Sequence, residues 1–449
     1  MGRVQLVASF VAAAMLLPSV ARAAEGRVLD VSEAIDIALG GNVDLEHASN
    51  AVAAGEVSVS MKKTVFLPVV QATMGPSMQL GKQFDQVSRE YKGVLGGSLS
   101  VGLHLDIMLF DGLSGVAMLR SAKKDLKATR HDLTRTQQDV IYETVVAFAA
   151  LLVAQELIRV DEENVLAQEQ ILELVKAQRE AGHALQADVL KQQAELESAR
   201  LTLLDAESDL AMDRLELERI LGLEAGSISG VKPLDATGEL PELDADEAVE
   251  AALAERPDLV ALTERIGAAE EQVKAACSGY MPRISLFAQA GTSWSSMMDR
   301  YYSFPEQMFE NNLNAVFGLS VVIPIFDGLV TKYEVDAARV EVASRKIDLE
   351  GAEQQVEIEV RQAFEDLEKA TKQLEVATAQ LGYASESLAA YEEMYALGGC
   401  TLVDVSESKA LETKAAYDMV EARYGLLLGA LAIEHAIGDS DAMIGMLSG

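Results

Sequence analysis

Residues 97–113 read GSLSVGLHLDIMLFDGL and contain two hydrophobic periods in succession. Every second residue from Leu99 to Leu109 is apolar, while the residues between them are mostly polar or glycine. This alternation predicts a β-strand with one apolar and one polar face. It stops at Asp111 and Gly112, and a helical period follows. The segment therefore predicts a strand that passes directly into a helix.

The same arrangement occurs again at residues 314–329, which read NAVFGLSVVIPIFDGL. Further segments recur in the same order at an offset of about 215 residues, which is the signature of an internal repeat. The matched pairs are Leu29–Ala34 with Leu243–Ala248, Pro68 with Pro282, Asp111-Gly112 with Asp327-Gly328, and Gly182 with Gly398. We therefore interpret the chain as a tandem duplication.

Each copy is predicted to contribute one strand hairpin, at about 68–110 and about 282–326. The predicted strands of about 10 to 13 residues fit either a soluble sandwich or tilted strands in an outer membrane. Four strands are too few to close a barrel, and open strand edges have no partner in lipid. A barrel in a membrane would therefore need several copies of the chain.

Long helices are predicted after each hairpin, over residues 113–181 and 329–397, because neither range contains proline. Each would be about 100 Å long at a rise of about 1.5 Å per residue. Return helices follow the glycine turns, at 186–222 and 402–438. In the first return helix, apolar residues recur every seven positions: Val189, Leu196, Leu203, Leu210 and Leu217. This spacing predicts coiled-coil packing.

The N-terminus has the features of an export signal. Arg3 precedes an apolar run at residues 4–20, and residues 21–23 (Ala-Arg-Ala) form a small-x-small cleavage site. We predict a signal peptide at 1–23 and a mature chain that begins at Ala24; the alternative is a single membrane anchor. We expect no later stretch to reach the roughly 18 to 20 apolar residues of a spanning helix.

These elements predict two repeats, at 24–222 and 243–438, each with a leading helix, a hairpin, a long helix and a return helix. The first leading helix is predicted over residues 30–66. A linker rich in glycine and proline, at 223–242, is expected at mid-height. The C-terminal tail, 439–449, has no pattern that predicts structure.

Composition excludes several classes of protein. The chain of 449 residues carries 71 acidic and 37 basic residues, for a net charge of −34, which would repel nucleic acid. Two cysteines, Cys277 and Cys400, do not make a disulfide framework, and no metal-ligand spacing, catalytic triad or phosphate-binding loop is present in the sequence. We therefore expect no enzyme, no cofactor, no metal site and no nucleic-acid partner.

The duplicated Leu-x-x-x-Glu-Ala segments, the prolines before the hairpins, the twin Phe-Asp-Gly junctions and the Gly-to-Asp-Val turns resemble the TolC-like outer-membrane efflux proteins. The resemblance covers the whole mature chain. It implies an α+β membrane protein in which three protomers give four strands each to one 12-stranded barrel. Their helices would continue the barrel as a coiled-coil tunnel across the periplasm of a Gram-negative bacterium.

The same resemblance implies a function. The chain would be the outer-membrane exit duct of a tripartite efflux or type I secretion system. Its partners would be two further copies, outer-membrane lipid, a periplasmic adaptor protein, and an inner-membrane pump or ABC transporter. The turns at Gly182, Gly398 and Gly399 would dock the adaptor, and the helix–strand junctions would lie at Pro68 and Pro282, and at Asp111-Gly112 and Asp327-Gly328.

The resemblance also implies a gate at the helical tips. Tyr395 matches a latch tyrosine of the family, Asp188 matches its acidic partner, and Asp404 and Glu407 match two acids that ring the pore. Cys400 departs from the family pattern, because it stands where a latch arginine is expected. Alternatively, Asp404 and Glu407 are ordinary acids in the first turn of a helix, where they interact with its dipole.

Two other classes of protein remain as alternatives at this point. A periplasmic adaptor also has a long helical hairpin and an export signal, but it would have one hairpin between β-rich segments. A structural coiled-coil protein would not need the alternating strands. Fractionation separates these classes, because only the duct would be a trimer in the outer membrane.

Overall fold

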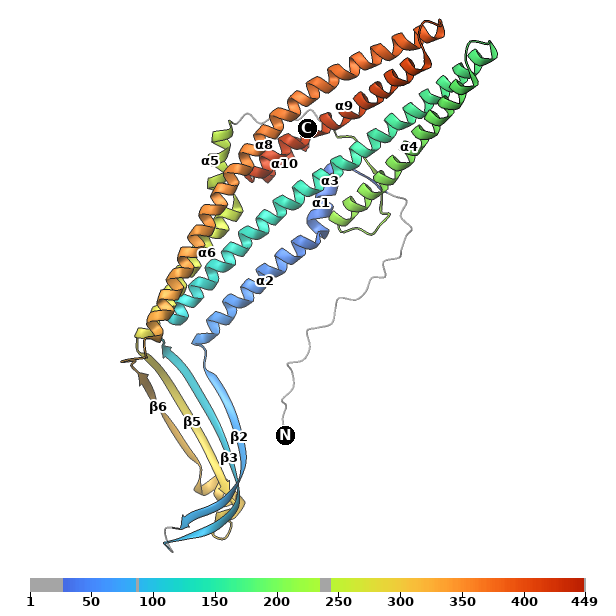
Figure 1. The fold of residues 1–449 in the computed structure, drawn as a ribbon. Coiled ribbons are helices and arrows are strands. Elements are labelled where there is room, and N and C mark those ends of the chain that lie inside the picture. The colour runs from blue at the N-terminus through green and yellow to red at the C-terminus, as the bar shows by residue number, and fades with distance from the viewer. Residues whose placement is uncertain (1–26, 86–88, 235–243, 448–449) are drawn as a thin grey trace.

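The computed structural model describes residues 27–85, 89–234 and 244–447. The predicted signal peptide at 1–23 lies outside these ranges. The molecule is elongated, with a sheet of strands at one end and long helices that extend to the other end (Figure 1). The turns between the long helices and the return helices therefore lie far from the sheet.

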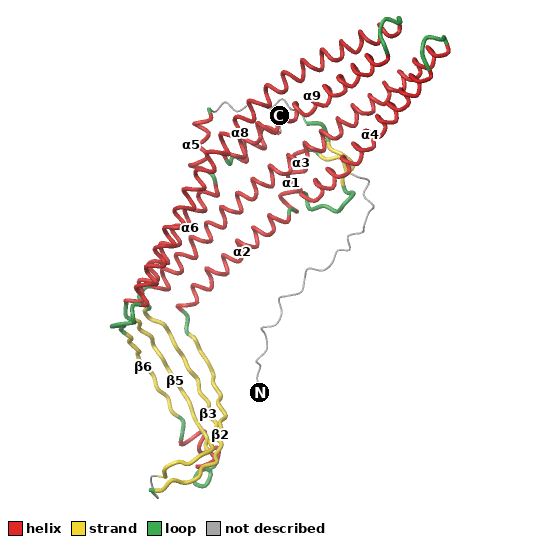
Figure 2. The backbone as a smooth tube through the Cα atoms, in the orientation of Figure 1, coloured by secondary structure: helices red, strands yellow, loops and turns green. Residues whose placement is uncertain are grey.

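The two halves of the chain have the same order of elements. The first half contains α1 (Val31–Gly41), α2 (Val43–Lys63), η1 (Thr64–Phe66), β2 (Val69–Asp85), β3 (Glu90–Phe110), α3 (Ser114–Glu180) and α4 (Gln186–Ile220). The second half contains α5 (Ala245–Glu255), α6 (Pro257–Cys277), η2 (Ser278–Tyr280), β5 (Arg283–Ser295), β6 (Asn314–Val322), α8 (Val330–Ala396) and α9 (Leu402–Ile437). Short helices between β5 and β6 are η3 (Ser296–Met298), α7 (Phe304–Glu306) and η4 (Gln307–Asn311). Figure 2 shows both helical pairs running side by side away from the strands.

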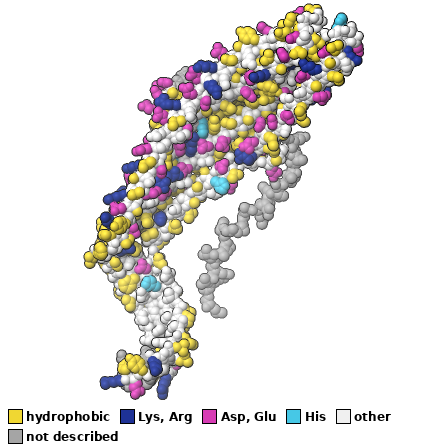
Figure 3. Space-filling model, in the orientation of Figure 1, with side chains coloured by type: hydrophobic (Ala, Val, Ile, Leu, Met, Phe, Trp, Pro, Cys, Tyr) yellow, Lys and Arg dark blue, Asp and Glu magenta, His cyan; other side chains and the backbone are white. Residues whose placement is uncertain are grey.

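The sheet has the order β2-β3-β5-β6, and all neighbouring strands are antiparallel. Opposed residues share a face, so the register places Met74, Val101 and Thr292 on one side. The apolar rows of β3 and β6 lie on this same face, as their alternation predicts. In Figure 3 the visible part of the sheet has few charged side chains, whereas both signs of charge are spread over the helices.

Two predictions about the strands were wrong. β2 has 17 residues and β3 has 21, which is longer than expected, because the ladder between them continues to the pair Asp85 and Glu90. β6 ends at Val322, although the hairpin was predicted to reach 326. Pro324 follows two residues later, and a proline has no N–H to donate to a strand ladder.

The leading helix of each repeat is divided, so the prediction of one helix over 30–66 was also wrong. Asn42 has an extended backbone and separates α1 from α2, and its Oδ1 accepts the N–H of Asp44 (2.8 Å). Arg256 separates α5 from α6 at the matching place. The two helices of each pair can therefore change direction to follow the long helix.

The main core lies at mid-height, where α1, α3, α4 and α9 meet around Phe148, Leu217 and Leu431. The predicted linker at 223–242 contains a strand, β4 (Ile228–Val231), which pairs in parallel with β1 (Arg27–Leu29). The predicted tail contains α10 (Ser440–Leu447), whose Met443 is buried in the same core. The predictions for the linker and the tail therefore missed two short elements, β4 and α10. Their apolar residues can be identified as core residues only from the contacts that they make. Residues 235–243 of the linker lie outside the described ranges.

Among the described residues, one helix, α3, is long and apolar enough to span a membrane by length and composition. The expectation that no such stretch exists was therefore wrong. Half of its most apolar window is buried inside the chain, and core residues from Val140 to Leu152 explain that hydropathy. Core helices of soluble proteins pass the same test, so this observation is weak support for a membrane span.

Candidate functional site at the helical tips

The turns at the two helical tips are built alike. Gly182 and His183 donate to carbonyl groups near the end of α3 over 3.0 and 2.8 Å, and Gly398 and Gly399 do the same at the end of α8 over 3.0 and 2.8 Å. Gly182 has φ +83° and Gly398 has φ +74°, a conformation that favours glycine. These are Schellman motifs, which end a helix while pairing its last carbonyl groups. Both turns are therefore compact.

The acidic residues after the turns cap the return helices. Asp404 Oδ2 accepts the N–H of Thr401 (2.8 Å) and its hydroxyl (2.6 Å), and Asp188 Oδ2 accepts the N–H of Leu185 (2.8 Å). The Thr401 hydrogen bonds hold the pKa of the Asp404 carboxyl below its ordinary value. Asp404 and Asp188 therefore share one local role, which is the first-turn role of the alternative interpretation.

Tyr395 packs between the two tips. Its side chain is 6% exposed and lies in a cluster with Val175 of α3 and Val189 of α4. Burial raises the pKa of the Tyr395 hydroxyl, and the charges of Asp188 and Cys400 raise it further. Tyr395 therefore packs where the two hairpins meet, and its role as a latch with Asp188 stays a prediction.

The other predicted tip residues lie at the surface or in the turn. Glu407 is exposed on α9, one turn after the partly buried Asp404. The Cys400 thiol donates to Tyr391 O (3.3 Å), and burial raises the pKa of this thiol. Gln178 Nε2 donates to Tyr395 O (3.3 Å), which links the first hairpin to the second. Cys400 therefore makes a hydrogen bond within its own hairpin, at the position where a latch arginine is expected from the family resemblance.

The strand–helix junctions also share one geometry. Asp111 Oδ2 accepts the N–H of Gly115 (2.6 Å), and Asp327 accepts the N–H groups of Leu329 (3.0 Å) and Thr331 (2.8 Å). Hydrogen bonds from Thr331 hold the pKa of Asp327 below its ordinary value. Each aspartate therefore caps the long helix that follows it.

The glycine and the leucine after each aspartate are both left-handed, with φ between +70° and +71° at Gly112, Leu113, Gly328 and Leu329. A leucine in this conformation is strained, so the surrounding contacts must hold it in place. Pro68 and Pro282 lie between the short helices η1 and η2 and the strands that follow. All predicted junction residues thus lie where helices meet the sheet.

A buried polar contact between the two hairpins was not predicted. Asp161 of α3 is 1% exposed, and the Tyr417 hydroxyl of α9 donates to its Oδ1. Its Oδ2 has no hydrogen-bond partner among the described residues. Burial raises the pKa of Asp161, although the Tyr417 hydrogen bond opposes this effect. The sequence signal was an acid within an otherwise apolar seam, which periodicity alone does not identify.

Replacing Tyr417 with phenylalanine should lower the free energy of unfolding by about 1–3 kcal/mol near pH 8, because the buried carboxylate loses its donor. The tyrosine stabilises the charged form, so the loss should shrink as the pH falls and Asp161 takes up a proton. Thermal unfolding of the purified protein at pH 8 and pH 4.5 measures both effects. Tyr301→Phe, at an exposed tyrosine, is the matched control. A loss independent of pH would contradict this role.

A second unpredicted contact fixes the leading helices at mid-height. Arg256 is 4% exposed, and it donates to Asp258 Oδ2 (2.8 Å), Glu359 Oε2 (2.7 Å) and Ala436 O (3.2 Å). At the matching break in the first half, Asn42 Nδ2 donates to Ile220 O (2.9 Å). The two halves thus satisfy the same carbonyl position at the end of the return helix with different side chains.

Within residues 27–85, 89–234 and 244–447, no cluster of histidine, cysteine, aspartate or glutamate could hold a metal ion. Cys277 and Cys400 are both free thiols. They lie at opposite ends of the helical part, at the base of α6 and in the turn after α8.

Comparison with known proteins identifies the family. The sequence profile described as "Outer membrane efflux protein" matches residues 34–223 and 248–439. The chain is 25% identical to outer membrane protein TolC of Escherichia coli, over 81% of this chain and 74% of that protein. It is 24% identical to outer membrane efflux protein BepC of Brucella suis, over 57% of this chain but only 54% of that protein.

The fold agrees with solved structures. The outer-membrane channel OprN superposes with a TM-score of 0.78 at 21% identity, over 92% of this chain and 90% of that chain. The predicted resemblance to TolC-like proteins is therefore confirmed, since the profile match covers most of both halves. The chain belongs to the outer membrane efflux protein family.

Proposed function

We propose that three copies of the chain close one 12-stranded barrel in the outer membrane and continue it as a helical tunnel. The observation that carries this proposal is the four-stranded sheet, in which β2 and β6 are edge strands. Unpaired backbone groups at such edges are costly in lipid, and pairing β6 of one copy with β2 of the next removes them. Closure by symmetry needs the same contact three times.

The junctions support this arrangement. A Cβ at Gly112 would lie 2.7 Å from Met281 Cβ and 2.8 Å from Ser278 O, so this junction is packed against the second half. Gly328 is the matching residue, and a Cβ there would meet nothing within 4 Å. The matching partner would be the segment around Leu67, which is exposed in this chain. A second copy would therefore fill the space at Gly328.

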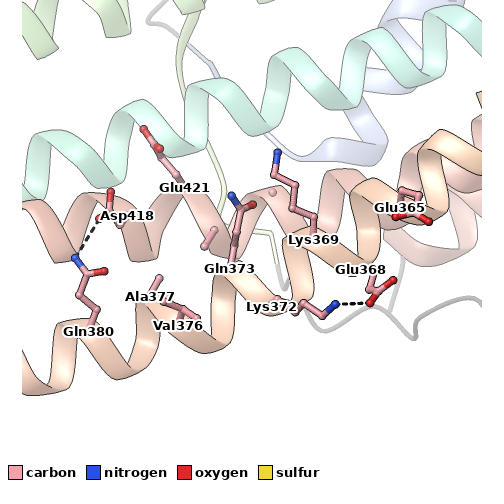
Figure 4. A pocket seen from close by; sticks show the side chains of 12 residues that line it. Glu365, Glu368, Lys369, Lys372, Gln373, Val376, Ala377, Gln380, Asp418 and Glu421 are labelled. Carbon is pink, nitrogen blue, oxygen red and sulfur yellow. Dashed lines mark hydrogen bonds and ion pairs between the residues drawn. The ribbon is translucent and has the colours of Figure 1, made fainter.

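The helices support it as well. A groove of about 740 Å³ lies between α8 and α9, where Gln380 Nε2 donates to Asp418 Oδ2 (3.3 Å) beside Ala377 (Figure 4). An adjoining groove of about 560 Å³ is mostly apolar and includes Val376 and Leu411. Together they form a long furrow on the face of the second hairpin. The corresponding face of the first hairpin is covered by α9.

The repeat identifies the occupant of this furrow. Ala377 matches Asp161, and Leu201 of α4 matches Tyr417, at the offset of 216 that relates the two turns. Asp161 and Tyr417 meet inside one chain, whereas Leu201 is 58% exposed. We therefore infer that α4 of the next copy lies in the furrow, as α9 lies on α3. This is the relation expected if the two halves arose by duplication.

Family membership makes the chain an outer-membrane duct of a Gram-negative bacterium and not an enzyme, and it decides against the adaptor and filament alternatives. Similar proteins include the protein CyaE of Bordetella pertussis and the alkaline protease secretion protein AprF of Pseudomonas aeruginosa. We propose that the duct receives cargo from an inner-membrane pump or ABC transporter. A periplasmic adaptor would hold the pump against the turns at Gly182, Gly398 and Gly399.

Fractionation and electrophoresis test the assembly. The tagged chain should be found in the outer-membrane fraction and migrate as a trimer in unboiled samples and as a monomer after boiling. Leu201→Asp should weaken the trimer, because it places a charge in the furrow of the next copy. Ser198→Asp is the control, since Ser198 is exposed and its match, Lys414, is exposed too. A monomeric wild-type chain, or equal effects of the two variants, would reject this arrangement.

A further inference from the structure

A cavity lies next to the helix-side end of the strands, between the first two turns of α3 and the last two turns of α6. Its volume is about 390 Å³, and its walls include Leu113, Val116 and Met281. Arg120 and Lys274 also line it, together with Glu271. The cavity thus combines an apolar side near the sheet with charged groups farther away.

The position of the cavity relative to the membrane follows from β3. The apolar row from Leu99 to Leu109 would rise about 25 Å at a strand tilt of about 40°, which is the height of the apolar band of such barrels. The cavity begins at Gly112, immediately beyond this band. It therefore lies at the level of the headgroups of the periplasmic leaflet.

The cavity also faces outward. Arg283 belongs to the polar row of β5, with Ser285 and Gln289, and it lines a different cavity of about 520 Å³ with Asp125 of α3. The two cavities lie on opposite sides of the contact between α3 and α6, because they use different faces of both helices. In the proposed barrel the polar row faces the lumen, so the 390 Å³ cavity would face the lipid side.

One carboxylate oxygen of Glu271 lacks a hydrogen-bond donor. Its side chain is 9% exposed, and its Oε1 accepts from Lys274 Nζ (2.6 Å). Its Oε2 is buried and has no hydrogen-bond partner among the described residues. A buried carboxylate oxygen without a donor is costly, so a ligand that supplies one would be stabilised. Arg120 is exposed at the same cavity.

We propose that this cavity binds the headgroup of a zwitterionic phospholipid with a primary ammonium, such as phosphatidylethanolamine. The phosphate would lie against Arg120 and Lys274, and the ammonium would donate to the Glu271 carboxylate. The glycerol and the start of the acyl chains would contact Leu113 and Met281. A quaternary ammonium has no N–H to donate, so the site distinguishes ethanolamine from choline headgroups.

The repeat provides an internal comparison. The place that matches Glu271 in the first half is Val57, and the place that matches Lys274 is Ser60, at the offset of 214 that relates the leading helices. A site formed there with a second copy would lack both charged groups. We therefore expect one selective headgroup site per protomer and not two.

Native mass spectrometry of the purified full-length protein, stripped of lipid and titrated with defined phospholipids, tests the site. The wild type should bind phosphatidylethanolamine about tenfold more tightly than phosphatidylcholine or phosphatidylglycerol. Glu271→Gln should remove this preference for ethanolamine. Arg120→Gln should weaken the binding of all three lipids, since it removes a phosphate contact. Glu270→Gln changes an exposed acid beside the site and should leave binding unchanged.

Equal binding of ethanolamine and choline lipids by the wild type would overturn the proposal, and so would an unchanged preference in Glu271→Gln. Retention of the isosteric variant in the outer-membrane fraction shows that it has folded. The cavity is formed within one chain, so the inference rests on the proposed barrel only for the side that the cavity faces, lipid or lumen. A monomer that binds ethanolamine lipid selectively would support the headgroup site while rejecting the assembly, so the two proposals fail separately.

Discussion

Replacing Arg256 with methionine is expected to lower the free energy of unfolding by about 3 kcal/mol. The guanidinium joins α6 to α8 through Glu359 and to α9 through Ala436 O, and it pairs with Asp258 in its own turn. Methionine fills a similar volume but leaves both acids without their partner. Chemical unfolding of the helical part, followed by circular dichroism, measures the loss.

Arg361→Met is the matched control for this substitution. Arg361 also joins two acids, Glu357 and Asp246, but its side chain is 50% exposed where that of Arg256 is 5% exposed. Exposed ion pairs contribute about 0–1 kcal/mol, so the control substitution should change the free energy of unfolding very little. Equal losses in the two variants would show that burial of Arg256 does not matter.

The effect of Arg256 should also depend on pH. Burial alone would raise the pKa of Asp258, but hydrogen bonds from Arg256 hold it below its ordinary value. A carboxyl with a depressed pKa contributes stability above its unfolded pKa and loses it as the pH falls. The difference between the wild type and Arg256→Met should therefore be largest at neutral pH and smaller below about pH 4.

Neutralising Asp404 and Glu407 together is expected to weaken block of the channel by multivalent cations by about tenfold or more. Threefold symmetry would place six carboxylates around one axis at the tips, and like charge concentrated at a constriction attracts cations. Single-channel conductance of the Asp404→Asn, Glu407→Gln variant in planar bilayers, titrated with a trivalent cation, measures the block.

The variant Asp188→Asn is a control that distinguishes loss of the acidic ring from loss of a helix cap. Asp188 accepts the N–H of its N-cap residue over 2.8 Å, as Asp404 does, but the residue that matches Glu407 is Lys191. Loss of a cap alone should therefore affect both variants alike, whereas loss of the ring should weaken block only in the double variant. Unchanged block there would leave Asp404 and Glu407 as first-turn acids.

Much of the fold was predictable because its signals are periodic. Alternation over Leu99–Leu109 predicted which face of β3 is apolar. The absence of proline between residues 113 and 181 predicted a long helix, and α3 spans Ser114–Glu180. The break at Asn42 was missed, although Gly40, Gly41 and Asn42 are residues that commonly end helices, because a helix resumes at Val43 directly after them. The contact that requires the break, with Ile220 O, comes from 178 residues away.

The candidate sites divide in the same way. The tip turns were identified from glycine and aspartate spacing, since a left-handed residue and a helix cap are local requirements. Asp161, Arg256 and Glu271 were not singled out, because each is an ordinary charged residue in sequence. Their importance comes from burial beside residues of another segment, which no local pattern records.

The sequence by itself determined the duplicated order of strands and helices, the apolar face of each strand, and the family of the chain. These properties depend on hydrophobic period and on glycine and proline, which act over a few residues. Only the tertiary structure decided which charged groups are buried, which edges and grooves remain open, and which carboxylate lacks a donor. Those properties depend on the distance between segments far apart in the chain, because hydrogen bonding and desolvation act only where atoms meet.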